Sequence, residues 1–444
     1  MQKKHFEVIL MSQITITHEI IGKIKPMHAV NNGPIFSGFD QISGNGPAYK
    51  AARIPYARNH DASFCSSYGG EHTVDITAIF PNFDADENDP ASYDFHFTDE
   101  YIQRTNLMGT ETFFRLGQKI EHGSKKYGIH PPKDFAKWAR ICEHIIRHMN
   151  EGWADGHHFG ITYWEIWNEA DLDPDDSPVR RNWTGTMAQF YEFFAIAAKH
   201  LKSCFPNLKI GGPALSNNLV WADGLLSYLD ERDIKIDFFS WHLYSYRPLT
   251  IIEHGLKIRE MLDRHGLYDT ESILDEYNYV LGWTDEFVDS LRVIPTVKGA
   301  AFFAEMMLRG QDNPIDMMMY YDARPCAWNG LFSPYVYDVL PSYHALCMFS
   351  DLYALGEQIK VRCDDEEIVA VGATNGETSA LMLSFYTNDD TRREFKRVSV
   401  ELPRGGRACV RILDKTRSAK KIYCDHYGTI SLNLRPNSVV YIEF

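Results

Sequence analysis

Residues 161–171 read ITYWEIWNEAD, an apolar run rich in aromatic and β-branched residues that ends in Asn168-Glu169 before a polar loop. A short apolar run of this composition predicts a strand that is buried on both faces, as in a parallel sheet. The carboxylate of Glu169 then stands where the strand ends. In (β/α)8 barrels this end of the strands carries the functional groups, because the βα loops surround it.

Helical periodicity flanks this strand on both sides. Residues 135–149 and 187–201 carry apolar side chains at three- and four-residue spacing, which predicts two amphipathic helices. Proline precedes the first helix at residues 131 and 132 and follows the second at residue 206, positions at which its missing N–H costs little. A strand between two such helices is typical of the repeat that builds a parallel sheet.

The same alternation extends from about residue 34 to residue 322. Its short apolar runs number eight, as a closed barrel requires, and lie at residues 34–39, 54–57, 111–116, 161–167, 208–211, 236–244, 273–275 and 317–321. We therefore predict an α/β fold with a (β/α)8 TIM barrel over residues 25–343.

The chain changes character after about Tyr343. Short alternating runs punctuated by Gly, Asn and Asp predict an accessory β-sandwich domain over residues 344–444, with strands at 367–373, 379–386, 397–402, 408–413 and 438–444. Residues 13–24 alternate in the same way before the barrel begins. We expect this N-terminal segment, within residues 1–24, to join that sheet.

Composition limits the class of protein. A length of 444 residues suits one barrel of about 250 to 330 residues and one accessory domain. The net charge of −15 and the lack of a Lys/Arg cluster argue against a nucleic-acid partner. The apolar run near the N-terminus is broken, and no stretch of about 18 apolar residues occurs, so we predict no signal peptide and no membrane partner. Eight scattered cysteines without a C-x-x-C pair predict reduced thiols and a cytoplasmic location. A homo-oligomer is left open.

A second carboxylate ends another predicted strand. Residues 273–278 read ILDEYN, and Glu276 follows Glu169 by 107 residues, a gap that three βα units fill. If Glu169 ends strand four, Glu276 ends strand seven, and the two face each other across the barrel mouth. Cleaving a glycosidic bond needs such a pair of carboxyl groups. The alternative is that either glutamate is a solvated loop residue.

Several motifs resemble clan A glycoside hydrolases and, more narrowly, glycoside hydrolase family 39. Residues 164–172, WEIWNEADL, resemble the acid/base segment of that family. Further matching segments follow the family's order at residues 24–34, 58–61, 211–213, 237–244 and 275–278. The resemblance covers most of residues 24–280, and the order of the motifs is more specific than any single one.

The resemblance implies a retaining glycosidase, most simply a β-xylosidase-like exo-enzyme that cleaves an equatorial bond of a glycoside or oligosaccharide. Glu169 is then the general acid/base and Glu276 the nucleophile, with no metal ion and no organic cofactor. Substrate-binding positions implied by the resemblance and by placement at strand ends are Arg58, His60, Asn168, His242 and Tyr244. Alternatives are an α-L-arabinosidase, a β-glucosidase, a polysaccharide endo-hydrolase, or a non-catalytic carbohydrate-binding barrel.

The last third of the barrel departs from the family's pattern. Strand eight is followed by Asp322, Arg324 and Trp328, which we also predict to bind substrate. Asp322 and Arg324 either face the mouth or form a buried ion pair that closes the barrel. This departure leaves the identity of the sugar open.

Two weaker patterns remain. His144 and His148 stand four apart on a predicted helix, as zinc ligands can, but the H-E-x-x-H order is absent, which favours a solvated helix face. The acidic run at residues 84–89 lacks the spacing of an EF-hand and reads as a solvated loop.

Overall fold

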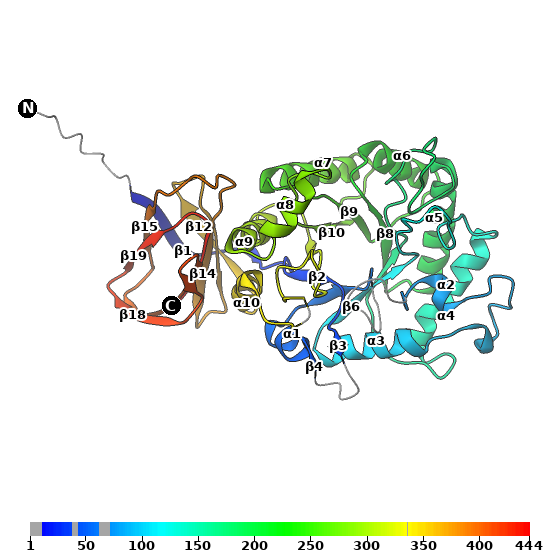
Figure 1. Ribbon diagram of the computed structural model, residues 1–444, viewed down its shortest axis with the longest axis horizontal. Coiled ribbons are helices and arrows are strands. Elements are labelled where there is room, and N and C mark those ends of the chain that lie inside the picture. The colour runs from blue at the N-terminus through cyan, green and yellow to red at the C-terminus, as the bar shows by residue number, and fades with distance from the viewer. Residues whose placement is uncertain (1–10, 38–42, 62–71, 335) are drawn as a thin grey trace, which may run out of the picture.

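The computed structural model describes residues 11–37, 43–61, 72–334 and 336–444. A barrel surrounded by helices lies beside a smaller sheet domain, and helices α9 and α10 lie between them (Figure 1). The described helices are α1 Gly46–Ala52, α2 Ile76–Ile79, α3 His96–Leu107, α4 Phe135–Glu151, α5 Met187–Cys204, α6 Leu219–Asp230, α7 Pro248–Arg264, α8 Glu286–Val293, α9 Val297–Gln311 and α10 Pro341–Tyr353, with a 3-10 turn at Pro90–Ser92.

Eight parallel strands close the barrel, which confirms the predicted fold class. In chain order they are β2 Ala29–Asn31, β5 Tyr56–Arg58, β6 Glu111–Leu116, β7 Tyr163–Ile166, β8 Lys209–Leu215, β9 Phe238–His242, β10 Glu271–Tyr277 and β11 Met317–Tyr320. Strand β11 pairs with β2 and completes the ring. The strand before Glu169 is therefore strand four, and the strand that contains Glu276 is strand seven.

The first barrel strand lies earlier than we predicted. Residues 34–39 were the expected strand, but β2 is only three residues long, ends at Asn31 and pairs with β5 and β11. Pro34 has no N–H to give to a ladder, and Phe36–Ser37 instead form β3, which pairs with β4, Ser43–Gly44, outside the barrel. Residues 38 and 39 of the expected strand lie outside the described part of the chain.

Both predicted helices form, and the reasons are local. The side chain of Asp134 accepts a hydrogen bond from the backbone N–H of Lys137 and caps α4 at its N-terminus. Thr186 and Gln189 form a capping box at the start of α5. The apolar stripe of each helix is buried against the barrel wall, which holds the strand between them, β7, in the ring.

The inside of the barrel is filled in layers. The lower layer is apolar and contains Ala29, Phe113, Tyr163, Phe238, Ile273, Met317 and Met319. Two residues further along strand β7, on the same face as Tyr163, Glu165 is fully buried. A polar layer therefore rests directly on the apolar one, and the residues at the strand ends lie above it.

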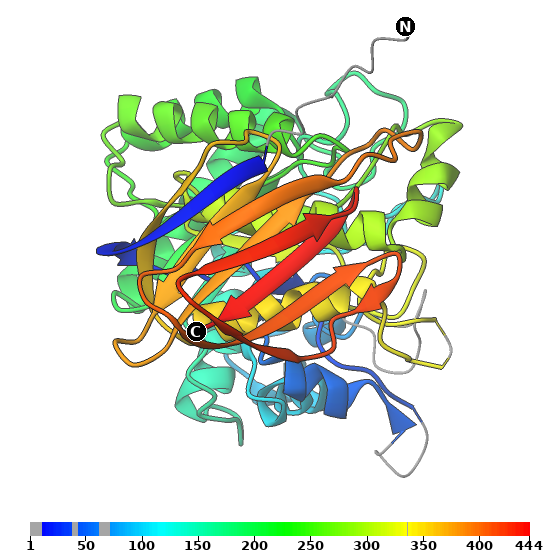
Figure 2. The same ribbon diagram turned by 90° about the vertical axis from the view of Figure 1, so that its left-hand side faces the viewer.

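The accessory domain is one continuous sheet, where we had predicted a β-sandwich. Ten strands follow the order β17-β16-β20-β14-β13-β12-β1-β15-β19, with β18 paired to β16. Their bounds are β1 Met11–Lys23, β12 Glu357–Cys363, β13 Val369–Thr374, β14 Ser379–Phe385, β15 Lys396–Glu401, β16 Gly406–Asp414, β17 Arg417–Ser418, β18 Ile422–His426, β19 Thr429–Leu434 and β20 Ser438–Glu443. Strands from both ends of this order share one apolar core, so the sheet is curled (Figure 2).

The outer face of the curled sheet packs on the barrel. Along β14, Leu381 and Leu383 point into the core of the sheet, whereas Ala380 and Met382 belong to the core shared with the barrel helices. The hydroxyl of Ser384 donates to the backbone oxygen of Ala301 in α9 at 3.0 Å. The expected boundary between the barrel and the accessory domain, at residue 343, falls inside helix α10. The exact bounds of the two domains therefore stay a prediction. Within the described residues, no helix is long and apolar enough to cross a membrane.

Candidate active site

Glu169 is held at the barrel mouth by a tight turn after β7. Trp167 and Glu169 both adopt left-handed backbone conformations, with φ of 74° and 43°. The backbone N–H of Trp167 donates to Leu116 of β6, and that of Glu169 donates to Ala214 of β8. Non-glycine residues persist in this conformation only where the surrounding structure holds them. The two neighbouring strands therefore fix the direction in which the Glu169 carboxylate points.

Glu276 comes from the end of β10 and is clamped by two hydrogen bonds. Arg58 Nη1 donates to Oε1 at 2.7 Å, and the hydroxyl of Tyr244 donates to Oε2 at 2.7 Å. Both bonds favour the ionised carboxylate. The side chain of Glu276 is only 6% exposed, so little water can replace either donor.

His242 stands between the two glutamates. Its Nδ1 lies 2.9 Å from Oε1 of Glu169 and 3.5 Å from Oε2 of Glu276. One carboxylate oxygen of each glutamate and a ring nitrogen of His242 all lie within 4.8 Å of one another. These atoms could also serve as metal ligands, but the Arg58 guanidinium bonds to Glu276 and the raised pKa of His242 keeps its ring positively charged, so both oppose a metal ion. The arrangement favours an organic substrate held between two carboxyl groups.

Burial and neighbouring charges shift the pKa values of the side chains at the mouth in opposite directions. Burial raises the pKa of Glu276 to about 7, although His242 and Arg58 act in the opposite direction. Burial alone would lower the pKa of His242, but Glu276 and Asp275 raise it well above its usual value. Burial holds the pKa of His60 well below its usual value, so this ring is neutral. His242 is accordingly an imidazolium that donates to Glu169.

Arg58 lies beneath the mouth, and this corrects our prediction that it contacts substrate. Its side chain has no exposed surface, and its guanidinium bonds to the side chains around it. These partners are Glu165 Oε2 at 2.6 Å, Asn31 Oδ1 at 3.1 Å, Glu276 Oε1 at 2.7 Å and Asn168 Oδ1 at 2.7 Å, with Asp275 Oδ2 at 3.2 Å. Arg58 is therefore a positioning residue that ties strands β2, β5, β7 and β10 together.

Two acids in this buried layer divide one proton between them. Burial raises the pKa of Glu165 well above its usual value, and the neighbouring Asp275 adds to this effect. Burial would also raise the pKa of Asp275, but His242 and Arg58 lower it to about 2. Glu165 is thus the protonated member and hydrogen-bonds Asp275, while Ser240 donates to its Oε1 and Arg58 to its Oε2, each at 2.6 Å. This leaves Arg58 and His242 as counter-charges for Asp275 and Glu276.

The other predicted polar residues lie around the same mouth. Asn168 Oδ1 accepts from Arg58, and its Nδ2 has no hydrogen-bond partner among the described residues. His60 Nε2 lies 3.9 Å from Oε1 of Glu276, and its Nδ1 has no partner in the same part of the chain. Both side chains are buried, and so are these two nitrogens. Their contact with a sugar stays a prediction.

Asp322 and Arg324 form the buried ion pair, one of the two alternatives we had left open. Arg324 Nη2 lies 3.1 Å from Oδ2 of Asp322 and 3.5 Å from Oδ2 of Asp61. Asp61 also accepts a hydrogen bond from the hydroxyl of Tyr321. Burial raises the pKa of Asp322 to about 6, although the nearby Arg324 acts in the opposite direction. Through Asp61 the pair links the segment that follows β5 to the segment that follows β11.

Trp328 belongs to an aromatic shelf beside the glutamates. We use this name for Tyr244, Trp283, Phe287, Tyr321 and Trp328, whose rings contact one another. The ring of Trp283 is 62% exposed and lies 5.4 Å from the ring of Tyr244. Exposed flat rings suit stacking on the apolar face of a sugar.

Sequence reasoning missed several residues of this site. Glu165 interrupts an apolar strand. This could have been recognised in the sequence, because a charged side chain inside a buried strand needs a partner. Asn182, whose Nδ2 lies 3.5 Å from Oε2 of Glu169, and Trp283 come from loops with no local signal.

An eight-stranded barrel that holds two carboxyl groups close together at the carboxyl ends of its strands has the arrangement that glycoside hydrolysis requires. The chain belongs to the glycosyl hydrolases family 39, whose model matches residues 57–314. It is 22% identical over 342 residues to a beta-xylosidase from Geobacillus stearothermophilus, an alignment that covers 67% of this chain and 65% of that protein.

Two solved structures share the whole fold. One is a glucosidase from Croceicoccus marinus, with a TM-score of 0.80, 22% identity and coverage of 98% of this chain and 99% of that one. The other is a monomeric beta-xylosidase from Caulobacter crescentus, with a TM-score of 0.72, 15% identity and coverage of 97% and 99%. At these identities the likeness establishes the fold, including the accessory sheet.

Proposed function

We propose that this chain is a retaining glycosidase that removes β-D-xylosyl groups from the non-reducing end of an oligosaccharide or glycoside. The observation that carries the proposal is the spacing of Glu169 and Glu276, which have oxygens within 4.8 Å of each other. Retaining enzymes hold their carboxyl groups about 5 to 5.5 Å apart, and inverting enzymes about 6.5 to 9.5 Å apart to admit water. The observed spacing supports retention.

The chemistry is a double displacement. Ionised Glu276 attacks the anomeric carbon while Glu169 gives its proton to the leaving oxygen, and a glycosyl ester forms on Glu276. Glu169 then takes a proton from water, which attacks the same carbon and releases the sugar with its configuration retained. Glu276 departs as a carboxylate, which Arg58 and Tyr244 again stabilise.

The remaining side chains supply binding. The unpartnered Nδ2 of Asn168 can donate to the 2-hydroxyl, a bond that strengthens in the transition state. His60, neutral and unpartnered at Nδ1, suits another ring hydroxyl. The aromatic shelf suits the leaving group, because Trp283 lies in the open and next to Tyr244, which itself contacts the nucleophile.

The choice of xylose rests on the relatives. The Geobacillus and Caulobacter proteins are beta-xylosidases, whereas the Croceicoccus protein is a glucosidase. A panel of p-nitrophenyl glycosides separates these possibilities. We expect the highest kcat/KM for the β-D-xyloside, with the β-D-glucoside and the α-L-arabinoside as the competing substrates. The proposal includes the cytoplasmic location, which is supported by the seven described cysteines, all of them free.

Replacing each glutamate tests the roles. In Glu276→Ala turnover falls about 10⁴-fold or more for every leaving group, because the attacking group is gone. In Glu169→Ala a p-nitrophenyl leaving group departs without protonation, so the glycosyl ester accumulates. Added azide then gives a glycosyl azide of retained configuration in Glu169→Ala and of inverted configuration in Glu276→Ala.

The control and the contradicting outcomes are clear. Glu271→Gln changes a carboxylate at the other end of β10 and leaves turnover unchanged. Azide products of the opposite configurations mean that the two roles are exchanged. If no aryl glycoside is hydrolysed but sugars still bind, the chain is the non-catalytic carbohydrate-binding barrel instead.

A further inference from the structure

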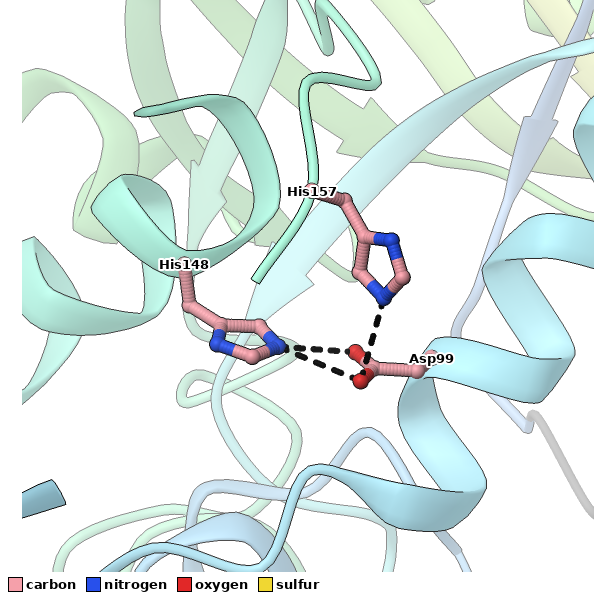
Figure 3. Close-up of side chains that lie close together, drawn as sticks. All are labelled: Asp99, His148 and His157. Atoms are coloured by element: carbon pink, nitrogen blue, oxygen red, sulfur yellow. Dashed lines mark hydrogen bonds and ion pairs between the residues drawn. The ribbon is translucent and has the colours of Figure 1, made fainter. Parts of the chain in front are cut away.

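Three metal-ligating side chains converge on the outside of the barrel, away from the network around Glu169 and Glu276. Asp99 lies in the first turn of α3, His148 in the last turn of α4, and His157 in the loop that follows α4 (Figure 3). One ligand atom from each lies within 4.8 Å of the other two. We propose that Asp99, His148 and His157 form a Zn²⁺ site that ties helix α3 to helix α4.

The distances suit a tetrahedral ion. His148 Nε2 lies 3.0 Å and 3.2 Å from the two oxygens of Asp99, and His157 Nε2 lies 3.2 Å from Oδ2 of Asp99. Ligands held about 2.0 to 2.1 Å from a tetrahedral Zn²⁺ stand about 3.3 to 3.4 Å apart. The histidine-to-aspartate distances are therefore close to those of a bound site, and the two imidazole nitrogens, which lie within 4.8 Å of each other, complete it by closing on the ion. Two imidazoles and one carboxylate with a fourth position for water are a donor set that Zn²⁺ favours.

The tautomer of His148 supports a cation at this point. Its Nδ1 lies 2.8 Å from the backbone oxygen of Trp153, which can only accept, so Nδ1 carries the proton. Nε2 is then the ring nitrogen that faces the carboxylate of Asp99 and that can bind an ion once it has lost its proton. A second-shell carbonyl that fixes the tautomer in this way is typical of histidine ligands to metals.

The site is rigid on one side and open on the other. The ring of His148 is 3% exposed and stacks on Phe95, with ring centroids 3.5 Å apart and planes 3° from parallel. Asp99 and His157 are 24% and 31% exposed. An ion can therefore enter from solvent and keep one water molecule, while His148 is already oriented.

The chain between the two histidines turns back in a constrained way. Ala154 and Asp155 adopt left-handed conformations with φ of 57° and 56°. The backbone N–H of His157 donates to the backbone oxygen of His148 at 2.6 Å. A Cβ at Gly156 would stand 2.2 Å from that same oxygen, so only glycine fits there. This costly turn has one clear result, which is to bring His157 beside His148.

The structure also corrects our interpretation of His144 and His148. His148 is buried rather than on a solvated face, and its Nε2 faces Asp99, which His157 also contacts. His144 directs Nδ1 at the backbone oxygen of Arg140 in its own helix, and its ring contacts Trp153.

A second group shows what a less suitable cluster looks like. Glu143, His200 and Cys204 also offer ligand atoms within 4.8 Å of one another. There, however, Arg147 donates two hydrogen bonds to Glu143 and supplies a positive charge that repels a metal ion. The partners of Asp99 in its cluster are imidazoles, which become ligands once they are neutral.

The test uses the full chain, first freed of metal with a chelator and then given Zn²⁺. We expect one tightly held Zn²⁺ per chain after dialysis, and a rise in Tm of about 3 to 6 °C when Zn²⁺ exceeds its Kd about 100-fold. Asp99→Asn and His157→Gln should lose both the bound ion and the Tm shift. The control is His158→Gln, which removes an exposed neighbouring histidine and should keep both. Co²⁺ in place of Zn²⁺ should give the intense visible absorption of a four-coordinate site, which the two site variants lack.

The outcomes that overturn the site are equally specific. If all four proteins bind Zn²⁺ alike, the ion sits on surface histidines and the proposal is wrong. The same holds if the unaltered chain keeps no Zn²⁺ after dialysis. Far-UV circular dichroism establishes that each variant is folded, and because both changed side chains are partly exposed, at least one should be. Hydrolysis of aryl glycosides at 25 °C is unaffected by the chelator, so a failed zinc site leaves the proposed function untouched.

Discussion

Replacing Tyr244 by phenylalanine removes one hydroxyl from the environment of Glu276 and leaves the aromatic shelf intact. That hydroxyl donates to Oε2 at 2.7 Å, and Arg58 continues to hold Oε1. Burial raises the pKa of Tyr244 well above its usual value, so the hydroxyl remains a donor throughout the assay range. The variant therefore changes one interaction with the ionised nucleophile.

The magnitude follows from that bond. A hydrogen bond to a charged group contributes about 1.5 to 3 kcal/mol, and each 1.36 kcal/mol is about one pKa unit. The pKa of Glu276 is about 7 in the unaltered protein, and losing a donor to the charged form raises it to about 8 or 9. Since attack needs the ionised form, kcat/KM at pH 7 falls about 5- to 50-fold, and much of the loss is recovered as pH rises.

The assay is the pH dependence of kcat/KM for p-nitrophenyl β-D-xyloside between about pH 5 and 9.5, because this ratio reports groups of the free enzyme. The acid limb should lie near pH 7 in the unaltered protein and shift upward in Tyr244→Phe. Tyr321→Phe is the matched control, since its hydroxyl donates to Asp61 instead. An acid limb that stays in place in Tyr244→Phe, with activity reduced equally at every pH, refutes this account of the nucleophile.

Two further predictions address the layer below the mouth and the shelf beside it. Glu165→Gln should retain activity within about 10-fold, because an amide reproduces a protonated carboxyl that donates to Asp275 and accepts from Arg58. Glu165→Ala leaves buried groups unpaired and should cost about 2 to 4 kcal/mol of stability. Equal kinetics and equal unfolding midpoints for the two variants contradict a shared proton. Trp283→Ala should raise KM for xylo-oligosaccharides about 5- to 20-fold with kcat little changed, since removing a stacking ring costs about 1 to 2 kcal/mol of binding free energy. An unchanged KM means that the leaving group binds elsewhere.

The barrel and the positions of its paired acids were predictable because their signals are local. Periodic apolar stripes on α4 and α5 frame β7, and a carboxylate directly follows an apolar run at Glu169. The position of strand β2 was not predicted, because three residues are too few to show a periodic pattern. The strands that pair with it lie far from it along the chain or give no local signal of the pairing.

Which side chains lie buried inside the barrel was harder to predict from the sequence than the order of its strands. Arg58 stood out at the end of a predicted strand, but its role depends on side chains from β2, β7 and β10 that meet it only after the ring closes. Asp322 and Arg324 left two geometries open for the same reason, since their third partner, Asp61, lies in the turn after another strand, β5. The site histidines His148 and His157 are close in sequence, yet only the tight turn between them brings their rings together.

The position of β1 has a consequence for how the chain is made. Lys23 pairs with Glu357, 334 residues later, so the first described strand waits for almost the whole chain before its neighbours exist. At a synthesis rate of about 5 to 20 residues per second, this delay is roughly 20 to 70 s. Meanwhile Ile14 and Ile16, which end up in the core of the curled sheet, have no surface to cover them. During synthesis the chain therefore carries an unpaired β-strand while the barrel folds. We expect chaperones to bind this strand, and we expect chains truncated near the C-terminus to aggregate.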